Sequence, residues 1–200
     1  MVFAKAAEAG ASKTRLMPLL GASGAAAAHA ELVQRTLAWV APLAGANSRY
    51  AVSLWGASQH RMLKAWSRQA GLPLRQQADG DLGWRMQHAL ANALAQGASK
   101  AIVVGSDCPV MNSNYIDLAQ RALDEADIVF GPAEDGGYVL VGCKRSRAEL
   151  FEGIEWGSSR VLAQSLAKAE ACGLSVALLE TLWDVDRPED WLRYRRRVDE

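Results

Sequence analysis

The stretch AIVVGSDCP, residues 101–109, is an apolar run that ends in a polar turn. A short run without polar side chains, rich in Ile and Val, is typical of a strand buried on both faces. Pro109 ends the strand, so we expect Asp107 at its carboxyl end. Similar runs recur along the chain and predict strands at residues 1–4, 50–55, 74–76, 101–105, 128–131, 138–141 and 175–179.

Most of these runs are separated by longer segments of helical period. Apolar positions spaced three or four residues apart mark helix faces within residues 33–40, 82–94, 115–126 and 161–169. The alanines at 25–28 also fit a helix, and Gly71, Gly97 and Gly173 stand where helix C-caps are expected. This alternation predicts an α/β fold with a mainly parallel sheet. Residues 128–131 and 138–141 are too close for a crossover helix, so we expect an antiparallel excursion that makes the sheet mixed.

Composition narrows the function classes. The chain has 200 residues, half of them hydrophobic, and no Pro/Gly/Ser-rich linker, which predicts a single domain over residues 1–200. Its 22 basic and 22 acidic residues balance, which argues against nucleic acid or an anionic membrane as the main partner. Its three cysteines and three histidines lack zinc-ligand spacing, and no signal peptide or membrane span is evident. We therefore expect a cytoplasmic protein with reduced thiols.

The loop after the first strand carries two cations, Lys13 and Arg15. A P-loop would need Gly directly before the Lys and another Gly upstream, where this chain has Ser12 and Ala7. The P-loop interpretation therefore fails. An ammonium and a planar guanidinium suit a diphosphate, whereas the alternative is an ordinary solvated basic turn. The residues alone leave both open.

Carboxylates at strand ends point to a metal. Asp107 could bind Mg²⁺ or Mn²⁺ while phosphate oxygens complete the coordination, or it could cap the following helix. We favour the metal, because the acid follows a strand and the chain also offers a candidate phosphate grip. Asp184 and Asp186 flank Val185, and either could be the second ligand. Asp186 also reads as the N-cap of a last helix with Pro188 in its first turn.

Three further turns could contact substrates. Asp135 begins an Asp-Gly-Gly turn that predicts a β-hairpin, and whether Asp135 also acts on substrate stays open. Gly80 and Asp81 precede a helix whose N-terminus could receive an anion or a nucleoside, although Asp81 is also a plain N-cap candidate. Trp156 precedes another helix and could stack on a sugar or a base, or belong to the core.

At these residues the chain resembles a bacterial family of glycosyltransferase-like proteins, "rSAM/selenodomain-associated transferase, type 1", in the GT-A nucleotide-diphospho-sugar transferase superfamily. The resemblance covers nearly the whole chain and rests on five motifs in order. They begin with Lys5 through Lys13-Thr14-Arg15-Leu16 and continue with Gly80-Asp81-Leu82-Gly83, Ser106-Asp107-Cys108-Pro109, residues 132–138 (PAEDGGY), and Asp184-Val185-Asp186 with Pro188-Glu189-Asp190.

The resemblance implies a GT-A-like three-layer α/β/α sandwich with a nucleotide half and an acceptor half. On the nucleotide side it implies Lys5, Lys13, Arg15, Gly80, Asp81 and Ser106, with Asp107 and Asp186 at Mg²⁺ or Mn²⁺. On the acceptor side it implies Asp135, Gly136, Gly137, Tyr138 and Trp156.

The leading hypothesis is metal-dependent transfer of a glycosyl group from a nucleotide-diphospho-sugar to a small-molecule acceptor. Lys13 and Arg15 would stabilise the leaving diphosphate, and Asp135 would be the acceptor-side base. The alternative enzyme is a nucleotidyltransferase that joins an NTP to a phosphorylated metabolite and releases pyrophosphate. A third hypothesis is a nucleotide-binding or partner-binding protein without catalysis, because Ala6, Ala7 and Ala9 stand where the family has prolines. The sequence does not indicate an oligomeric state.

Overall fold

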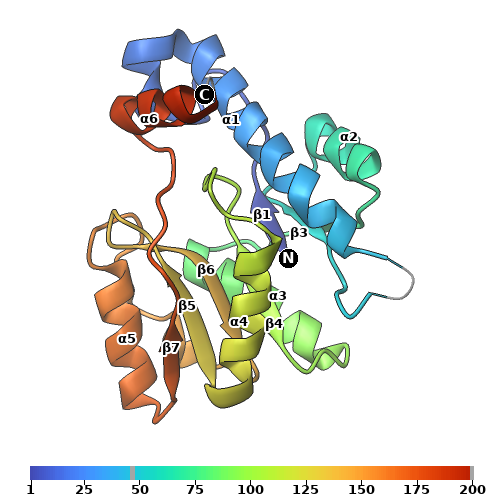
Figure 1. The fold of residues 1–200 in the computed structure, drawn as a ribbon, viewed down its shortest axis with the longest axis vertical. Coiled ribbons are helices and arrows are strands. Elements are labelled where there is room, and N and C mark those ends of the chain that lie inside the picture. The colour runs from blue at the N-terminus through green and yellow to red at the C-terminus, as the bar shows by residue number, and fades with distance from the viewer. Residues whose placement is uncertain (46–47, 199–200) are drawn as a thin grey trace. The chain divides into compact units, whose positions relative to one another are not determined.

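The computed structural model describes residues 1–45 and 48–198, and its internal contacts divide these residues into two compact units. Unit 1 comprises Met1 with residues 77–105 and 113–183. Unit 2 comprises residues 2–76, 106–112 and the segment from 184 onward. The chain therefore passes between the units several times, and Figure 1 follows it by colour.

Unit 1 contains four strands in the order β4-β6-β5-β7. Their bounds are β4 (Ala101–Val104), β5 (Ile128–Pro132), β6 (Tyr138–Cys143) and β7 (Val176–Leu178). β6 is antiparallel to both β4 and β5, whereas β5 and β7 are parallel. The antiparallel excursion that the short spacing predicted is thus confirmed, with Phe130 opposite Val141.

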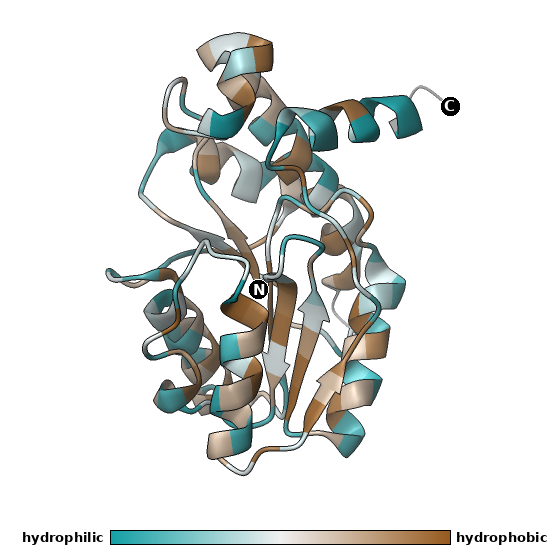
Figure 2. Ribbon diagram, turned by 90° about the vertical axis from the view of Figure 1, so that its left-hand side faces the viewer, coloured by the Kyte–Doolittle hydropathy of each residue, from teal (hydrophilic) through white to brown (hydrophobic). Residues whose placement is uncertain are grey.

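Three helices and a 3₁₀ turn accompany these strands: α3 (Leu82–Ala95), α4 (Ser113–Glu125), α5 (Val161–Ala171) and η3 (Ala148–Leu150). β4 and β5 are buried along their whole length, as expected for uninterrupted apolar runs. In the lower half of Figure 2 these mainly apolar strands lie between helices whose residues alternate in hydropathy. Each helix therefore buries one face and solvates the other.

Unit 2 is built on three parallel strands in the order β3-β2-β1, with bounds β1 (Val2–Ala4), β2 (Leu54–Gly56) and β3 (Leu74–Gln76). Its helices are α1 (Met17–Val40), α2 (Arg61–Ala70) and α6 (Pro188–Val198), with 3₁₀ turns η1 (Thr14–Leu16) and η2 (Ala41–Leu43). α1 contacts α2 and η1, and α6 contacts η1. The C-terminal helix thus belongs to the same unit as the first strand.

The long helix α1 is interrupted at Gly21, where φ is 67° and ψ is 174°. The alanines at 25–28 continue as helix, as predicted, and Ala25 and Ala28 lie in the core. The stretch Thr14–Leu43 is long and apolar enough to cross a membrane by length and composition alone, with 39% of its 18-residue window buried. A core helix has the same properties, so this finding is weak evidence for a membrane span.

The α/β class and the mixed, mainly parallel sheet are confirmed, because β6 alone runs against its described neighbours. The predicted strand at 50–55 is wrong at its start. β1 offers only Val2–Ala4 for pairing, so the register leaves β2 three residues, Leu54–Gly56. Gly71, Gly97 and Gly173 all have positive φ after helices, as predicted.

Candidate functional site

The loop after β1 presents Lys13 in a left-handed conformation, with φ 48° and ψ 46°. Among the described residues it is the single non-glycine position with positive φ, a conformation that is costly for most side chains. Ser12 holds the loop: its hydroxyl donates to Ala6 O at 2.8 Å and accepts from the Glu8 N–H at 3.0 Å. The loop therefore holds Lys13 in a conformation that is seldom adopted without an external constraint.

Lys13 lies at the centre of a network of alternating charges. Its Nζ is 2.8 Å from Asp107 Oδ2 and 3.9 Å from Asp186 Oδ1, and Arg15 donates to the other oxygen of Asp186. The Lys13 side chain is 5% exposed, whereas that of Arg15 is 58% exposed. The predicted phosphate cations and the predicted metal carboxylates thus form one cluster within unit 2.

Backbone contacts fix the two carboxylate segments. The Val185 N–H donates to Asp107 O at 2.9 Å, which joins the loop after β4 to the segment before α6. From α1, Arg35 Nε donates to Pro109 O at 2.9 Å. Val185 is fully buried, so Asp184 and Asp186 flank an anchored residue. This anchoring orients Asp186 toward Lys13 and Arg15.

His29 is a site residue that the sequence analysis did not identify. It lies on α1, is 1% exposed, and its Nε2 is 3.1 Å from Lys5 O. A carbonyl can only accept, so Nε2 carries the hydrogen. His29 Nδ1 lies 3.6 Å from Asp107 Oδ1, and neither atom has a hydrogen-bond partner in the described structure. A polar residue inside the Ala-rich segment was the only sequence signal.

The charges of the central pair are set by its surroundings. Burial raises the pKa of Asp107, but the surrounding groups, the Lys13 ammonium above all, outweigh burial and hold the pKa well below its usual range. Burial lowers the pKa of Lys13, but the Asp107 and Asp186 carboxylates outweigh burial and raise it. Both groups are therefore ionised at neutral pH. By contrast, burial raises the pKa of the Cys108 thiol to about 11, which leaves it protonated and unreactive.

The donor set of this cluster suits a hard divalent cation. Carboxylate oxygens are the ligands that Mg²⁺ and Mn²⁺ prefer, and Asp107 Oδ1 is a buried oxygen without a hydrogen-bond donor. The remaining oxygens of Asp107 and Asp186 face Lys13 and Arg15. Within residues 1–45 and 48–198, no group of three or more His, Cys, Asp or Glu residues could by itself hold a metal. Ligand oxygens would have to complete the coordination.

Two other predicted nucleotide residues lie in unit 2. Lys5 is exposed, and its carbonyl accepts from His29. Ser106 is 5% exposed, and its carbonyl accepts weakly from Thr36 on α1 at 3.4 Å. Both therefore support the loop architecture through their backbones.

The interpretation of Asp186 as an N-cap is wrong. The N–H groups of Asp186 and Arg187 donate to Asp190 Oδ2 at 3.2 and 2.8 Å, while the Asp186 carboxylate pairs with Arg15 and Lys13. Asp190, in the first turn of α6, reaches back and satisfies these donors. Asp186 is thereby available to the charged cluster.

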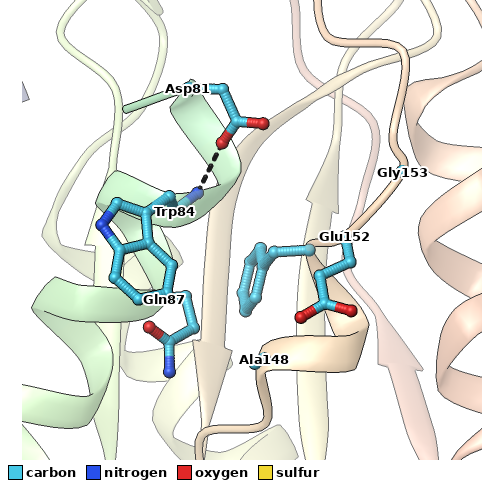
Figure 3. A pocket seen from close by; sticks show the side chains of 7 residues that line it. Asp81, Trp84, Gln87, Ala148, Glu152 and Gly153 are labelled. Carbon is cyan, nitrogen blue, oxygen red and sulfur yellow. Dashed lines mark hydrogen bonds between the residues drawn. The ribbon is translucent and has the colours of Figure 1, made fainter. Parts of the chain in front are cut away.

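Gly80 and Asp81 belong to unit 1. Asp81 Oδ1 accepts from the Trp84 N–H at 2.8 Å, so Asp81 is the N-cap of α3, as one of the two sequence interpretations held (Figure 3). Gly80 has φ 132°, and its carbonyl accepts from Arg85 Nε at 2.9 Å. The cap leaves Asp81 Oδ2 without a role in the helix.

The Asp135 turn joins β5 to β6 as the predicted hairpin. Asp135 is exposed, and its Oδ1 accepts from the Gly137 N–H at 2.8 Å. Gly136 has φ 89°, and a Cβ there would lie 2.1 Å from Ser159 O. This face of Gly136 is therefore covered by the segment before α5, and only a glycine fits.

The predicted acceptor residues Tyr138 and Trp156 contact each other edge to face, with ring centroids 6.3 Å apart. The Tyr138 hydroxyl and Trp156 Nε1 are buried, and neither has a hydrogen-bond partner in the described structure. Burial raises the pKa of Tyr138, so its hydroxyl stays protonated. The rings are thus partly packed into unit 1, and their polar atoms remain unsatisfied.

Comparison with known proteins places the chain in a family. The family described as "Uncharacterized protein conserved in bacteria (DUF2064)" matches residues 28–158, more than half of the chain. No curated protein sequence matches the chain. Among solved structures, the chain is similar to a candidate nucleotide-diphospho-sugar transferase from Desulfovibrio desulfuricans G20, with a TM-score of 0.80 and 29% identity over 93% of this chain and 80% of that one.

More distant structures share the fold. A 4-diphosphocytidyl-2C-methyl-D-erythritol synthase from Anaerococcus prevotii DSM 20548 has a TM-score of 0.64 at 12% identity, over 100% of this chain and 95% of that one. Glucosyl-3-phosphoglycerate synthase from Mycobacterium tuberculosis, solved with Mn²⁺ and UDP, has a TM-score of 0.57 at 11% identity, over 98% and 74%. The chain belongs to the DUF2064 family, and its fold is that of the GT-A-like nucleotide-diphospho-sugar transferases.

Proposed function

We propose that this protein transfers a glycosyl group from a nucleotide-diphospho-sugar to a small-molecule acceptor, with Mg²⁺ or Mn²⁺ as cofactor. The network of Lys13, Arg15, Asp107 and Asp186 in unit 2 carries the proposal. Its support is chemical: two cations suited to phosphate and two carboxylates suited to a divalent cation already contact one another.

The pairing within this network suggests how a diphosphate would bind. Lys13 and Arg15 are neutralised by Asp107 and Asp186, so the cluster of four side chains carries no net charge. A metal-bound diphosphate could replace these ion pairs. Its phosphate oxygens would bind Lys13 and Arg15, and the metal would bind Asp107 and Asp186. Because Lys13 is almost fully buried, its ammonium would be weakly screened and would interact strongly with a leaving phosphate.

The metal, once bound, would neutralise the charge that develops on the departing diphosphate. For this chain's residues, the proposal assigns Asp107 and Asp186 to hold the metal, and Lys13 and Arg15 to hold phosphate oxygens. Lys5, Ser106, Gly80 and Asp81 remain proposed nucleotide-side residues.

For the acceptor we propose Asp135 as general base, with Gly136, Gly137, Tyr138 and Trp156 as the accompanying residues. The exposed carboxylate of Asp135 has one oxygen fixed by Gly137 N–H, which orients the other. Replacing Asp135 by Asn keeps the turn acceptor and removes the base. We expect kcat to fall by about 10²-fold or more while nucleotide affinity is unchanged. Unchanged turnover would remove this role.

A nucleotidyltransferase is the second candidate, because the fold is shared with the erythritol cytidylyltransferase-type structure at a TM-score of 0.64. The two reactions differ in their products. Incubation with NDP-sugars and with NTPs, each with Mn²⁺ and a panel of acceptors, separates them: NDP release supports glycosyl transfer, and pyrophosphate release supports nucleotidyl transfer. A protein that binds nucleotide without metal and turns over no donor would be a non-catalytic binder.

The donor can be found by thermal shift against NTPs, NDPs and NDP-sugars with and without Mn²⁺. A ligand at one hundred times its Kd adds about 2.7 kcal/mol of stability, which a melt resolves. Asp107→Asn should abolish the metal-dependent shift. Asp124→Asn is the matched control, because Asp124 also pairs with a lysine, Lys100, but at an exposed position. A shift that survives in Asp107→Asn would contradict the proposed site.

A further inference from the structure

A pocket lies entirely within unit 1, between the first turns of α3 and the segment around η3. Its volume is about 360 Å³, the size of site that takes one small ligand. Gly83 brings its walls together: a Cβ there would lie 2.5 Å from Trp156 Cζ2 and 2.7 Å from Phe151 O. Glycine at position 83 therefore lets α3 approach the segment around η3 more closely than any residue with a Cβ would allow.

The pocket presents negative charge and an open aromatic surface. Asp81 and Glu152 both line it, and no Lys, Arg or His is among its described lining residues. Figure 3 shows Trp84 and Gln87 projecting from the α3 side and Glu152 from the opposite side. Trp84 is 53% exposed, which is unusual for so large an apolar side chain.

Two cations, Arg85 and Lys168, lie near the pocket without lining it. Arg85, next to Trp84, directs its Nε to the Gly80 carbonyl at 2.9 Å. Lys168 on α5 lies beside Gly153, a lining residue: its Nζ is 3.9 Å from the position that a Cβ on Gly153 would occupy. Neither residue lines the pocket. The side chains that line the pocket thus include two carboxylates and no cation, which favours a cationic ligand over a phosphate or a carboxylate.

We propose that this pocket binds a small organic cation that carries an alkylammonium group. An indole face is the best aromatic partner for such a cation, and the nearby carboxylates add long-range attraction. The Gln87 amide can donate a hydrogen bond to, or accept one from, another polar group of the same ligand. The pocket shares Asp81 with the proposed nucleotide side, but cation binding needs neither nucleotide nor metal and can be tested without them.

The test compares choline with 3,3-dimethyl-1-butanol, which has the same shape and no charge. The chain has seven tryptophans, so the indole N–H region of its ¹H–¹⁵N correlation spectrum should contain few peaks. Trp84→Phe identifies the Trp84 peak by its absence. Titration of the wild-type protein with choline should move this peak, while the neutral analogue should leave it in place.

Charge variants sharpen the result. Glu152→Gln should weaken choline binding about threefold to tenfold. Trp84→Leu removes the indole and should weaken choline binding about tenfold; because this variant lacks the Trp84 peak, its binding is followed by the NMR signals of the ligand. Glu149→Gln is the matched control, because Glu149 lies on η3, is exposed and does not line the pocket. Equal shifts with both ligands would show an apolar site and overturn the proposal. The proposal would also be overturned if choline did not move the Trp84 peak, or if only neutral methyl glycosides moved it.

Discussion

The two units use different means to hold their candidate functional segments. In unit 2, charged side chains converge, and Lys13, 5% exposed at its side chain, is held by the carboxylates of Asp107 and Asp186. In unit 1, the Asp135 turn is held by backbone geometry, since Gly136 at φ 89° contacts the backbone of Ser159. The charged cluster in unit 2 should therefore respond to charge and pH, and the Asp135 turn in unit 1 to the volume of a single methyl group.

The largest effect on stability is expected at Gly136. Gly136→Ala adds a Cβ 2.1 Å from Ser159 O at positive φ, so we expect a loss of about 3 kcal/mol or more. Gly157 is the matched control, because its φ is 85° and a Cβ there would meet nothing within 4 Å. Gly157→Ala should lose only about 1 to 2 kcal/mol from conformation. Urea denaturation measures both, and equal losses would show that backbone contact is unimportant.

Asp107→Asn should have the next largest effect. It leaves the buried Lys13 ammonium without its main partner, and breaking buried pairs costs about 3 to 5 kcal/mol. Because the Asp107 side chain is 36% exposed, we expect about 2 to 3 kcal/mol. The exposed pair that Asp124 makes should contribute less than about 1 kcal/mol, so Asp124→Asn is nearly neutral. Similar losses in the two variants would mean that the Lys13 pair behaves as a surface pair.

Acid should remove the contribution of Asp107. The pKa of Asp107 is lowered in the folded protein, whereas an unfolded Asp has a pKa of about 3.9. A depressed folded pKa gives stability that is present above about pH 4 and lost as pH falls toward the folded pKa. The stability difference between wild type and Asp107→Asn should therefore shrink from pH 6 to pH 3. Denaturation curves across this range test it, and a constant difference would contradict the electrostatic origin.

The smallest effect is expected at the α3 cap. Asp81→Ala removes the acceptor of the Trp84 N–H, and such caps contribute about 1 kcal/mol. Asp81→Asn retains the acceptor and should lose less than half of that. An unchanged melting temperature in Asp81→Ala would contradict this prediction, because it would mean that water satisfies the Trp84 N–H as well as the carboxylate does.

The sequence predicted most of this architecture because its signals are local. The apolar run before Asp107 and the Asp-Gly-Gly turn at 135–137 each specify a strand end or a hairpin by their own residues. The start of β2 was mispredicted, because the length of this strand depends on pairing with the three residues of β1. Strand length is set by the partner, which a local pattern does not contain.

The candidate site divides in the same way. Strand-end positions identified Lys13, Asp107 and Asp186 as candidates, and the structure brings them together. His29 was missed, because a lone histidine on a helix has no spacing to mark it, and its position beside Asp107 arises only from tertiary packing. Asp186 was mispredicted as an N-cap, because the carboxylate of Asp190 in the first turn of α6 reaches back and accepts from the N–H groups that precede the helix.

Isothermal titration of a nucleoside diphosphate in the presence of Mn²⁺ tests whether Asp107 and Lys13 form the nucleotide and metal site. The protein, Asp107→Asn and Asp124→Asn are compared with and without metal, after a panel has identified the preferred base. We expect metal-dependent binding by the wild-type protein and by Asp124→Asn, and at least about a hundredfold weaker binding by Asp107→Asn. Undiminished, metal-dependent binding by a folded Asp107→Asn variant would contradict the assignment of the Lys13 and Asp107 cluster as the nucleotide and metal site.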